Sequence, residues 1–255
     1  MTFARTQIEE LLYRLFINAP ATSLRDEDRR KSDEMAGLLD EVEAAVARRA
    51  RKDELVLVDA AAGKATVGLL AAELVLAPRG RPARVRVIER EPARVAACRD
   101  AIARLRAPSV SVEVVAADVA DPAAWPSEPD LVVALHACGR ASDMIIDQSL
   151  AVRARELLLV PCCTSKEVSA AALADRRAEQ LGMPRHAEVR RRFIQSIVDA
   201  ERTLRLEAAG WQTTVVGFVA PTVTPHNLLW RAERVGELGR MAEAADRLAR
   251  LRGAG

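Results

Sequence analysis

The stretch Glu54–Glu73, ELVLVDAAAGKATVGLLAAE, decides the fold of this chain. It opens on the continuous apolar run Leu55–Val58, which ends in an acid, Asp59, and a series of small residues. Such a run is typical of a parallel strand buried on both faces, and small residues let the next turn approach a ligand closely. Because Ala65–Val75 has the pattern of an amphipathic helix, the stretch predicts the strand, turn and helix that open a nucleotide-binding α/β domain. An ordinary βα unit without a ligand would have the same pattern.

The length and composition suit an α/β protein with an aliphatic core. The chain has 255 residues, enough for one large domain or one domain with an appendage. Half of the residues are hydrophobic but only 3% are aromatic, so the core must be built from alanine, valine and leucine. The net charge of +2 neither requires nor forbids a nucleic-acid partner.

The sequence shows no feature of secretion or membrane insertion. No signal-peptide core follows Met1, and no run of 18 apolar residues occurs. The four cysteines lack CxxC spacing, which predicts reduced thiols and no metal site. We therefore expect a cytoplasmic protein with no membrane partner.

Strand and helix patterns alternate through the middle of the chain. Strands are expected at Leu55–Asp59, Arg84–Ile88, Ser111–Ala116, Leu131–Leu135 and Leu157–Val160, with helices at Ala65–Leu76, Pro92–Leu105 and Ser142–Ala151. This alternation predicts a parallel sheet with right-handed crossovers. After a helix at Glu188–Ala209, the runs Trp211–Val219 and Asn227–Ala232 are joined by a short loop, which indicates an antiparallel pair.

The two ends of the chain read as helices. Apolar stripes predict helices at Thr6–Asn18 and Ser32–Arg51, so residues 1–52 are expected to form a helical cap on a main domain of residues 53–233. Residues 234–255 are expected to form a final helix. Five βα units closed by an antiparallel pair outline the Rossmann-like class I fold of S-adenosylmethionine-dependent methyltransferases. A nicotinamide dehydrogenase would more often carry G-x-G-x-x-G after the first strand, where this chain has A-A-A-G-K-A.

Acids stand at or just past the carboxyl ends of the first three expected strands. Asp59, Glu89 and Asp118 should meet at one edge of the sheet, because the carboxyl ends of parallel strands face the same crevice. Glu89 could accept both ribose hydroxyls of an adenosine, Asp118 its amino group, and Asp59 the methionine ammonium, directly or through water. Solvated acids also cap strands without any ligand, so each position alone is a weak signal.

Two further strand ends resemble a particular methyltransferase family. Asp130–Asp143 reads DLVVALHACGRASD and Leu157–Lys166 reads LLLVPCCTSK, and the later segment TPHNLLWRA fits the last strand of the same family. These segments resemble the methyltransferase-like 25 proteins and the tRNA 2′-O-methyltransferases that modify the acceptor stem. The family's His-x-Cys-Gly, Asp and Cys-Cys positions match His136, Cys138, Gly139, Asp143, Cys162 and Cys163.

The resemblance implies S-adenosylmethionine as cofactor. The implied cofactor positions are Asp59, Ala61, Gly63, Lys64, Glu89, Asp118, Val119, Leu135 and His136, and the implied catalytic positions are His136, Asp143, Cys162 and Cys163. Two glycines of the family's Asp-x-Gly-x-Gly-Lys-Gly turn are Ala61 and Ala65 here. If those positions need a positive φ, each alanine costs roughly 1 kcal/mol and its methyl group narrows the pocket. The family's Cys-Cys-His continuation is also absent, since Thr164 follows the cysteine pair.

Several residue roles stay open at this point. His136 could remove the acceptor's proton or only shape a loop, and the cysteines could be buried fillers or, less readily, nucleophiles of the RNA 5-methylcytosine type. The arginines between Arg185 and Arg205 could face RNA, but interspersed acids favour an ordinary solvated helix. We expect a methyltransferase acting on an acceptor that is RNA in preference to protein or a small molecule. The competing expectation is a non-catalytic methyltransferase-fold scaffold or RNA-binding subunit, suggested by the altered turn.

Overall fold

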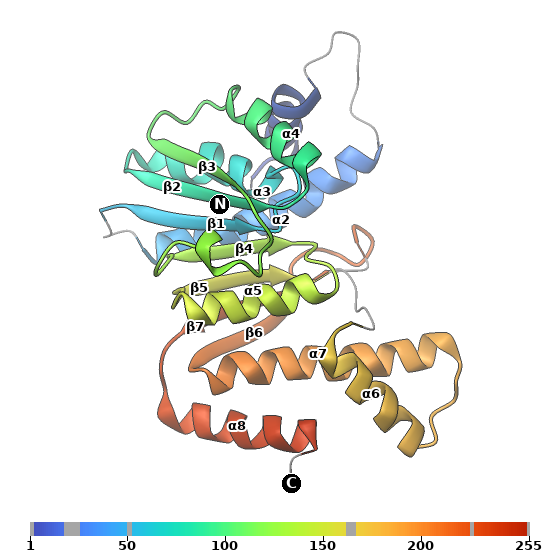
Figure 1. Ribbon diagram of the computed structural model, residues 1–255. Helices are drawn as coiled ribbons and strands as arrows, with labels where there is room; N and C mark the ends of the chain where they lie inside the picture. Colours follow the sequence, from blue (N-terminus) through green and yellow to red (C-terminus); the bar gives the residue numbers. More distant parts are fainter. Residues whose placement is uncertain (1–2, 18–25, 50–52, 162–166, 225–226, 254–255) are drawn as a thin grey trace.

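The computed structural model describes residues 3–17, 26–49, 53–161, 167–224 and 227–253 (Figure 1). In these ranges the chain forms a seven-stranded sheet of order β3-β2-β1-β4-β5-β7-β6. The strands are β1 (Leu55–Ala60), β2 (Ala83–Glu89), β3 (Val110–Ala116), β4 (Leu131–Leu135), β5 (Glu156–Val160), β6 (Trp211–Gly217) and β7 (Leu228–Arg234).

The sheet is parallel except at one end. β1 pairs in parallel with both β2 and β4, and β7 runs antiparallel to β5 and β6. The strand order reverses between β1 and β4, which is the place where open α/β sheets bind ligands. The Rossmann-like α/β fold expected from the sequence, with a mainly parallel sheet and an antiparallel end, is confirmed.

The helices lie on both faces of this sheet (Figure 1). They are α1 (Arg5–Leu12), α2 (Asp26–Ala47), α3 (Thr66–Leu70), α4 (Pro92–Ile102), α5 (Arg140–Ala151), α6 (Ser169–Gln180), α7 (Ala187–Ala208) and α8 (Leu238–Arg252). Shorter or wider turns are η1 (Tyr13–Ile17), η2 (Ala71–Leu76), η3 (Ala77–Arg79) and η4 (Pro122–Ala124). The helix expected at residues 65–76 is α3 continued by the wider turns of η2.

Helix α6 was not predicted from the sequence. Its sequence, SAAALADRRAEQ, buries alanines such as Ala174 and Ala178 in place of large apolar residues, so no hydrophobic stripe marks it. Two strand boundaries also differ from the expectation. β1 continues past Asp59 to Ala60 and β2 includes Glu89 as its last residue, whereas the expected strands ended at Asp59 and Ile88. Parallel pairing extends each of these strands by one residue past its expected end.

Strand β1 is buried on both faces, as its continuous apolar run predicts. Leu57 packs in one core with residues of α1, α2 and α3, including Ile8, Leu38 and Leu69. Its neighbour Val58 packs in a second core on the opposite face. The helices that precede β1 therefore share a continuous apolar core with the sheet.

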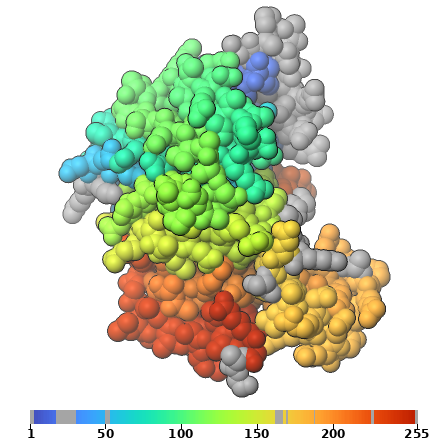
Figure 2. All heavy atoms as spheres, viewed as in Figure 1, coloured from blue at the N-terminus to red at the C-terminus, as the bar shows by residue number. Residues whose placement is uncertain are grey.

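The antiparallel end of the sheet carries helices α7 and α8, and α6 packs beside α7 (Figure 1). Val168, Ala170, Ala171 and Val198 form a small apolar cluster of their own between α6 and α7. In the space-filling view α6, in gold, stands out beside the body of the molecule, and α8 is red (Figure 2). None of the helices in the described ranges has the length and apolar character to cross a membrane.

Candidate functional site

The candidate site lies at the carboxyl ends of β1, β2, β3 and β4. Pairing in register places Asp59 of β1 beside Val87 of β2 on one side and Val133 of β4 on the other. Glu89, at the end of β2, pairs with Ala116 at the end of β3, two residues before Asp118. The sheet therefore brings the three predicted acids to one edge, next to the loop that begins at His136.

The turn after β1 keeps the backbone of a glycine-rich loop. Ala61, Gly63 and Ala65 have φ values of 53°, 60° and 60°, all in the left-handed region. Backbone hydrogen bonds hold the turn: the Ala62 N–H donates to Ile88 O at 3.1 Å, and the Ala65 N–H donates to Ala62 O at 2.8 Å. The two alanines therefore occupy positions where glycine carries no Cβ penalty.

Glu89 fastens this turn to β2. Its Oε2 accepts the Gly63 N–H and its Oε1 accepts the Glu91 N–H, both at 2.8 Å. The side chain lies largely buried beneath the turn. Because an ionised carboxylate has about four acceptor positions, Glu89 retains capacity for a diol after accepting two N–H groups.

Asp59 points into the start of the helix that follows the turn. Its Oδ2 accepts the Gly68 N–H at 2.7 Å, and a Cβ at position 68 would lie 2.9 Å from that oxygen. Burial raises the pKa of Asp59 to about 7, opposed by the Gly68 hydrogen bond and reinforced by the nearby Glu89 charge. The contacts of Asp59 are those of a residue that holds α3 against β1, and its role toward a methionine ammonium stays a prediction.

Asp118 is better placed to meet a ligand. It is partly exposed, its Oδ1 accepts the Ala120 N–H at 2.9 Å, and its Oδ2 accepts from Arg90 Nη1 at 2.9 Å. The Ala120 hydrogen bond and the Arg90 guanidinium lower the pKa of Asp118, so it is ionised at neutral pH. Of the other predicted positions, Val119 is buried and Lys64 is exposed.

The loop after β4 is held by a contact with helix α2, which lies outside the sheet. His136 follows Leu135, the partly buried last residue of β4, and has a φ of 57°, which is uncommon for a non-glycine residue. Its Nε2 lies 2.9 Å from Oε2 of Glu34, a buried carboxylate on α2. Glu34 was not found by the sequence analysis, because 102 residues separate it from its partner and its local pattern is that of a charged helix.

Asp143 takes part in an ion-pair network. Its oxygens accept from Arg202 at 2.9 and 3.2 Å and from Arg205 at 2.8 Å, and the Arg202 side chain is only 1% exposed. A buried guanidinium needs such a partner. These contacts favour a structural role that fastens α5 to α7, and the catalytic role expected for Asp143 stays a prediction.

The cysteines fall into three groups. Cys162 and Cys163 lie outside the described residues. Cys138 is disulfide-bonded, so the expectation of reduced thiols is wrong for this residue, because the spacing of cysteines along the sequence does not show which sulfurs the fold brings together. Cys98 is buried, its thiol donates to Gly63 O at 3.4 Å, and burial raises its pKa to about 12, which makes it an unreactive filler.

The donor set can be tested against an adenosyl cofactor. A side chain at Gly63 would meet no atom within 4 Å, so the turn is open on that side. Glu89 and Asp118 add carboxylates on neighbouring strands, which suit hydroxyl and amino donors. The residues present therefore fit the cofactor. In the parts of the chain that the structure describes, no group of three or more histidine, cysteine or acidic side chains is arranged to hold a metal ion.

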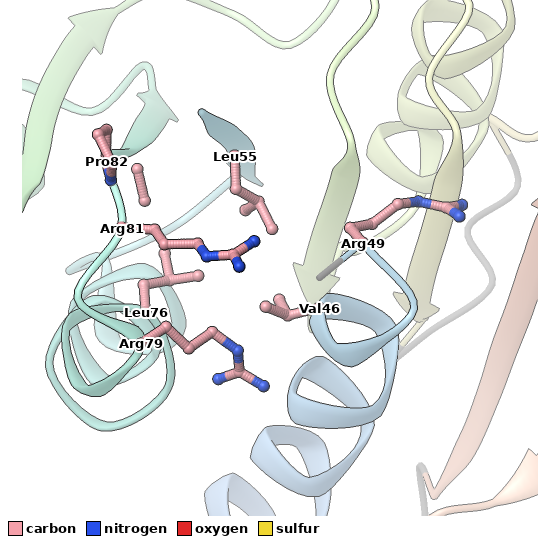
Figure 3. A pocket seen from close by; sticks show the side chains of 8 residues that line it. Val46, Arg49, Leu55, Leu76, Arg79, Arg81 and Pro82 are labelled. Atoms are coloured by element: carbon pink, nitrogen blue, oxygen red, sulfur yellow. The ribbon is translucent and has the colours of Figure 1, made fainter. Parts of the chain in front are cut away.

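A separate hollow of about 250 Å³ lies at the opposite edge of the sheet (Figure 3). Its lining is Val46, Arg49, Leu55, Leu76, Arg79, Arg81, Pro82 and Ala83. Leu55 and Ala83 are the first residues of β1 and β2, so the hollow is at the amino ends of the strands. Arg79 is already paired with Glu43 at 2.7 Å and Arg49 with Glu233 at 3.2 Å. The hollow is therefore not part of the site around His136.

A family model described as a methyltransferase domain matches residues 30–171, more than half of the chain. The match begins in α2 and therefore includes Glu34 as well as the turn after β1 and His136. No curated protein gives a sequence match to the chain.

Solved structures resemble the chain in fold. A candidate rRNA methylase from Clostridium thermocellum superimposes with a TM-score of 0.50 at 8% identity, over 84% of this chain and 100% of that one. Magnesium protoporphyrin IX methyltransferase from Synechocystis PCC 6803 with bound S-adenosylmethionine gives 0.49 at 14% identity, over 91% and 97%. Its form with bound S-adenosylhomocysteine gives 0.47 at 14% identity, over 91% and 99%. At these identities the likeness concerns the fold alone.

Proposed function

The chain belongs to a family of methyltransferase domains, and from that premise we propose that it methylates RNA with S-adenosylmethionine as the donor. When bound, this cofactor supplies an electrophilic methyl group on a sulfonium centre. The protein must then align an acceptor with that group and remove its proton. The matched methyltransferase domain favours an enzyme over the competing expectation of a non-catalytic scaffold.

The residues at the carboxyl edge divide these tasks. Glu89 would hold the ribose hydroxyls, since its carboxylate already fixes the turn at Gly63. Asp118, ionised and partly exposed, would accept from the adenine amino group. Asp59 would act indirectly, by holding α3 and the turn in place. His136 would receive the proton of the acceptor.

The observation that carries the RNA proposal is the position of the α6–α7 arm, defined here as residues 167–198. Arg202 contacts Gly139 O at 3.5 Å and the first turn of α5, so this point of α7 lies level with the carboxyl edge of the sheet. The preceding part of α7, residues 187–201, is roughly 20 Å long at 1.5 Å per residue and runs past the sheet (Figure 1). The arm therefore overhangs the side of the molecule where an acceptor would enter.

The arm is also basic. It contains six arginines and four acids, a net charge of +2 that equals the net charge of the whole chain. Arg185, Arg191 and Arg192 expose 87%, 72% and 78% of their side chains. Exposed arginines beside a site can neutralise phosphates and position a polynucleotide. The resemblance of the His136 loop to tRNA 2′-O-methyltransferases supports the same acceptor class.

Cofactor binding can be measured before the acceptor is known. Calorimetry should show binding of S-adenosylmethionine and S-adenosylhomocysteine, and Glu89→Ala should weaken both about tenfold or more, as expected for lost charge-assisted hydrogen bonds. Glu91→Ala is the matched control, because this exposed neighbour contributes only its backbone N–H to Glu89. Equal affinities in the two variants would remove Glu89 from the site, and no binding at millimolar ligand would overturn the cofactor assignment.

The acceptor class is tested with tritiated cofactor and fractionated cell RNA, protein and metabolites. We expect label in RNA, and reduced labelling when Arg185, Arg191 and Arg192 are all changed to glutamine. The affinity for S-adenosylhomocysteine should stay the same in that variant. Label confined to the protein or metabolite fraction would refute the RNA proposal.

A further inference from the structure

The contact between His136 and Glu34 joins the methyltransferase sheet to the N-terminal helix α2. Of the two side chains, that of His136 is 37% exposed and that of Glu34 only 7% exposed. The histidine can therefore meet a ligand at the carboxyl edge, whereas the carboxylate behind it is shielded from water. This arrangement of an accessible imidazole with a buried carboxylate is the one that enzymes use to orient a histidine.

Burying the Glu34 carboxylate costs free energy of folding, which argues against a purely structural role. Its Oε2 meets His136, but its Oε1 is buried and has no hydrogen-bond partner among the described residues. Leaving a buried charged acceptor half satisfied disfavours folding. Its neighbour Met35 and the nearby Leu38 belong to the apolar core, whereas Glu34 brings a carboxylate to a buried position.

Strain in the backbone points to the same place. His136 adopts a left-handed conformation with a φ of 57°. Residues held in such conformations persist where the surroundings enforce them, and they are concentrated at functional sites. The hydrogen bond to Glu34 and the strand end at Leu135 together fix where the imidazole lies.

We propose that Glu34 is a positioning residue for His136, holding its imidazole so that Nδ1 accepts the proton of the RNA acceptor during methyl transfer. This proposal rests on the proposed function. In the proposed arrangement Glu34 is ionised and can only accept a hydrogen bond, so that the Nε2 atom facing it carries the hydrogen. In the neutral imidazole the lone pair is then on Nδ1.

The proton transfer balances without any further reactant. The hydroxyl or N–H of the acceptor gives its proton to Nδ1, and the electron pair left on the acceptor forms the new bond to the methyl carbon. The electron pair of the broken carbon–sulfur bond stays on sulfur. Glu34 then faces an imidazolium across the Nε2 hydrogen bond and stabilises its charge.

The hydrogen bond can be examined without any acceptor. The chain has three histidines, His136, His186 and His226, so the imidazole signals of ¹⁵N-labelled protein can be assigned by substitution. We expect a downfield, slowly exchanging Nε2–H signal from His136 that disappears in Glu34→Ala. Glu43→Gln is the matched control, since Glu43 lies on the same helix and pairs with Arg79 instead. A His136 signal that is unchanged in Glu34→Ala would overturn the proposal, whether or not the protein methylates RNA.

The catalytic effect is measured with total cellular RNA and tritiated S-adenosylmethionine. His136→Ala should lower kcat about 10²- to 10⁴-fold, the range for loss of a general base, and Glu34→Gln about 10- to 100-fold. The KM for RNA and the affinity for S-adenosylhomocysteine should change less than about threefold in both variants. Glu43→Gln should keep the wild-type kcat. A wild-type kcat in Glu34→Gln would refute the positioning role, whereas failure of the wild type to bind S-adenosylhomocysteine would refute the proposed function itself.

Discussion

The loops after β1 and after β4 flank the switch point of the sheet. They have similar backbone conformations but use their side chains differently. Both contain non-glycine residues with positive φ: Ala61 and Ala65 in the first, His136 in the second. In the first loop the carboxylates of Asp59 and Glu89 accept backbone N–H groups and are buried. In the second, the side chain itself is accessible and a carboxylate from another helix holds it.

This difference separates residues that stabilise the fold from the residue proposed to take part in methyl transfer. Acids that accept backbone N–H groups shape a turn, so their substitution should change stability, and for Glu89, which keeps free acceptor positions, also the affinity for the cofactor. An accessible imidazole contributes little to the fold, and its substitution should first change turnover. The following substitutions test that division, from the largest expected change in stability to the smallest.

Asp59→Asn should make stability less sensitive to pH. The pKa of Asp59 rises from 3.8 to about 7 in the folded protein because of burial, which corresponds to about 4 kcal/mol at 1.36 kcal/mol per pH unit. The folded state thus binds this proton more tightly than the unfolded chain. Its stabilising contribution is complete below pH of about 4 and is lost as the pH rises through about 7. Asparagine keeps an acceptor for the Gly68 N–H and cannot ionise.

Urea denaturation between pH 4 and pH 8 measures this effect. The wild type should lose stability across the window relative to Asp59→Asn, so that the variant is the more stable protein at pH 8. Glu113→Gln controls for the loss of one negative charge, since Glu113 is an exposed carboxylate paired with Arg86. Parallel pH curves for the wild type and Asp59→Asn would show that Asp59 does not carry the proton.

The first loop was largely predictable from the sequence, and the second was only half predictable. The continuous apolar run of β1 predicts a strand that is buried on both faces. The acids at the strand ends are expected to meet because the carboxyl ends of parallel strands lie at one edge of the sheet. His136 could be located from its motif. Its partner Glu34 could not, because a contact across 102 residues leaves no local pattern. Helix α6 was missed for a related reason, since its buried face is built of alanines.

The same limit applies to Asp143, whose expected role came from a motif and whose contacts come from the fold. Asp143→Ala would leave Arg202, which is 1% exposed, without its hydrogen-bonded carboxylate. Breaking a buried pair in this way costs about 3 kcal/mol. We therefore expect a clear loss of stability in urea denaturation, with methyl transfer per folded molecule changed less than about threefold.

Asp147→Ala is the matched control for that network. Asp147 also contacts Arg205, at 3.1 Å, but its side chain is 60% exposed. An exposed pair contributes at most about 1 kcal/mol. If Asp143→Ala instead abolished methyl transfer and left stability unchanged, Asp143 would act in catalysis together with the second loop. The separation between stabilising acids and a catalytic histidine would then be wrong.

The smallest expected effect concerns the two alanines of the first loop. Ala61→Gly removes a Cβ held at a φ of 53°, which relieves about 1–2 kcal/mol, while the added freedom of the unfolded chain opposes it by about 0.4–1 kcal/mol. The net expectation is a gain of about 0.5–1 kcal/mol. Ala65→Gly should gain less, because its methyl group is fully buried and burying a CH₂-sized group contributes about 0.8 kcal/mol.

Ala62→Gly is the matched control for the effect of a positive φ. Ala62 lies between the two positions but is not among the residues with positive φ, so glycine there should only lose stability. Thermal and urea unfolding of the three variants should rank Ala61→Gly above Ala65→Gly and Ala62→Gly. Calorimetry with S-adenosylhomocysteine adds a second readout, since removing the Ala61 methyl group also widens the approach to the turn. A loss of stability in Ala61→Gly equal to that in Ala62→Gly would mean that the turn is not held in the glycine-type conformation, and the first loop would then lose its architectural role.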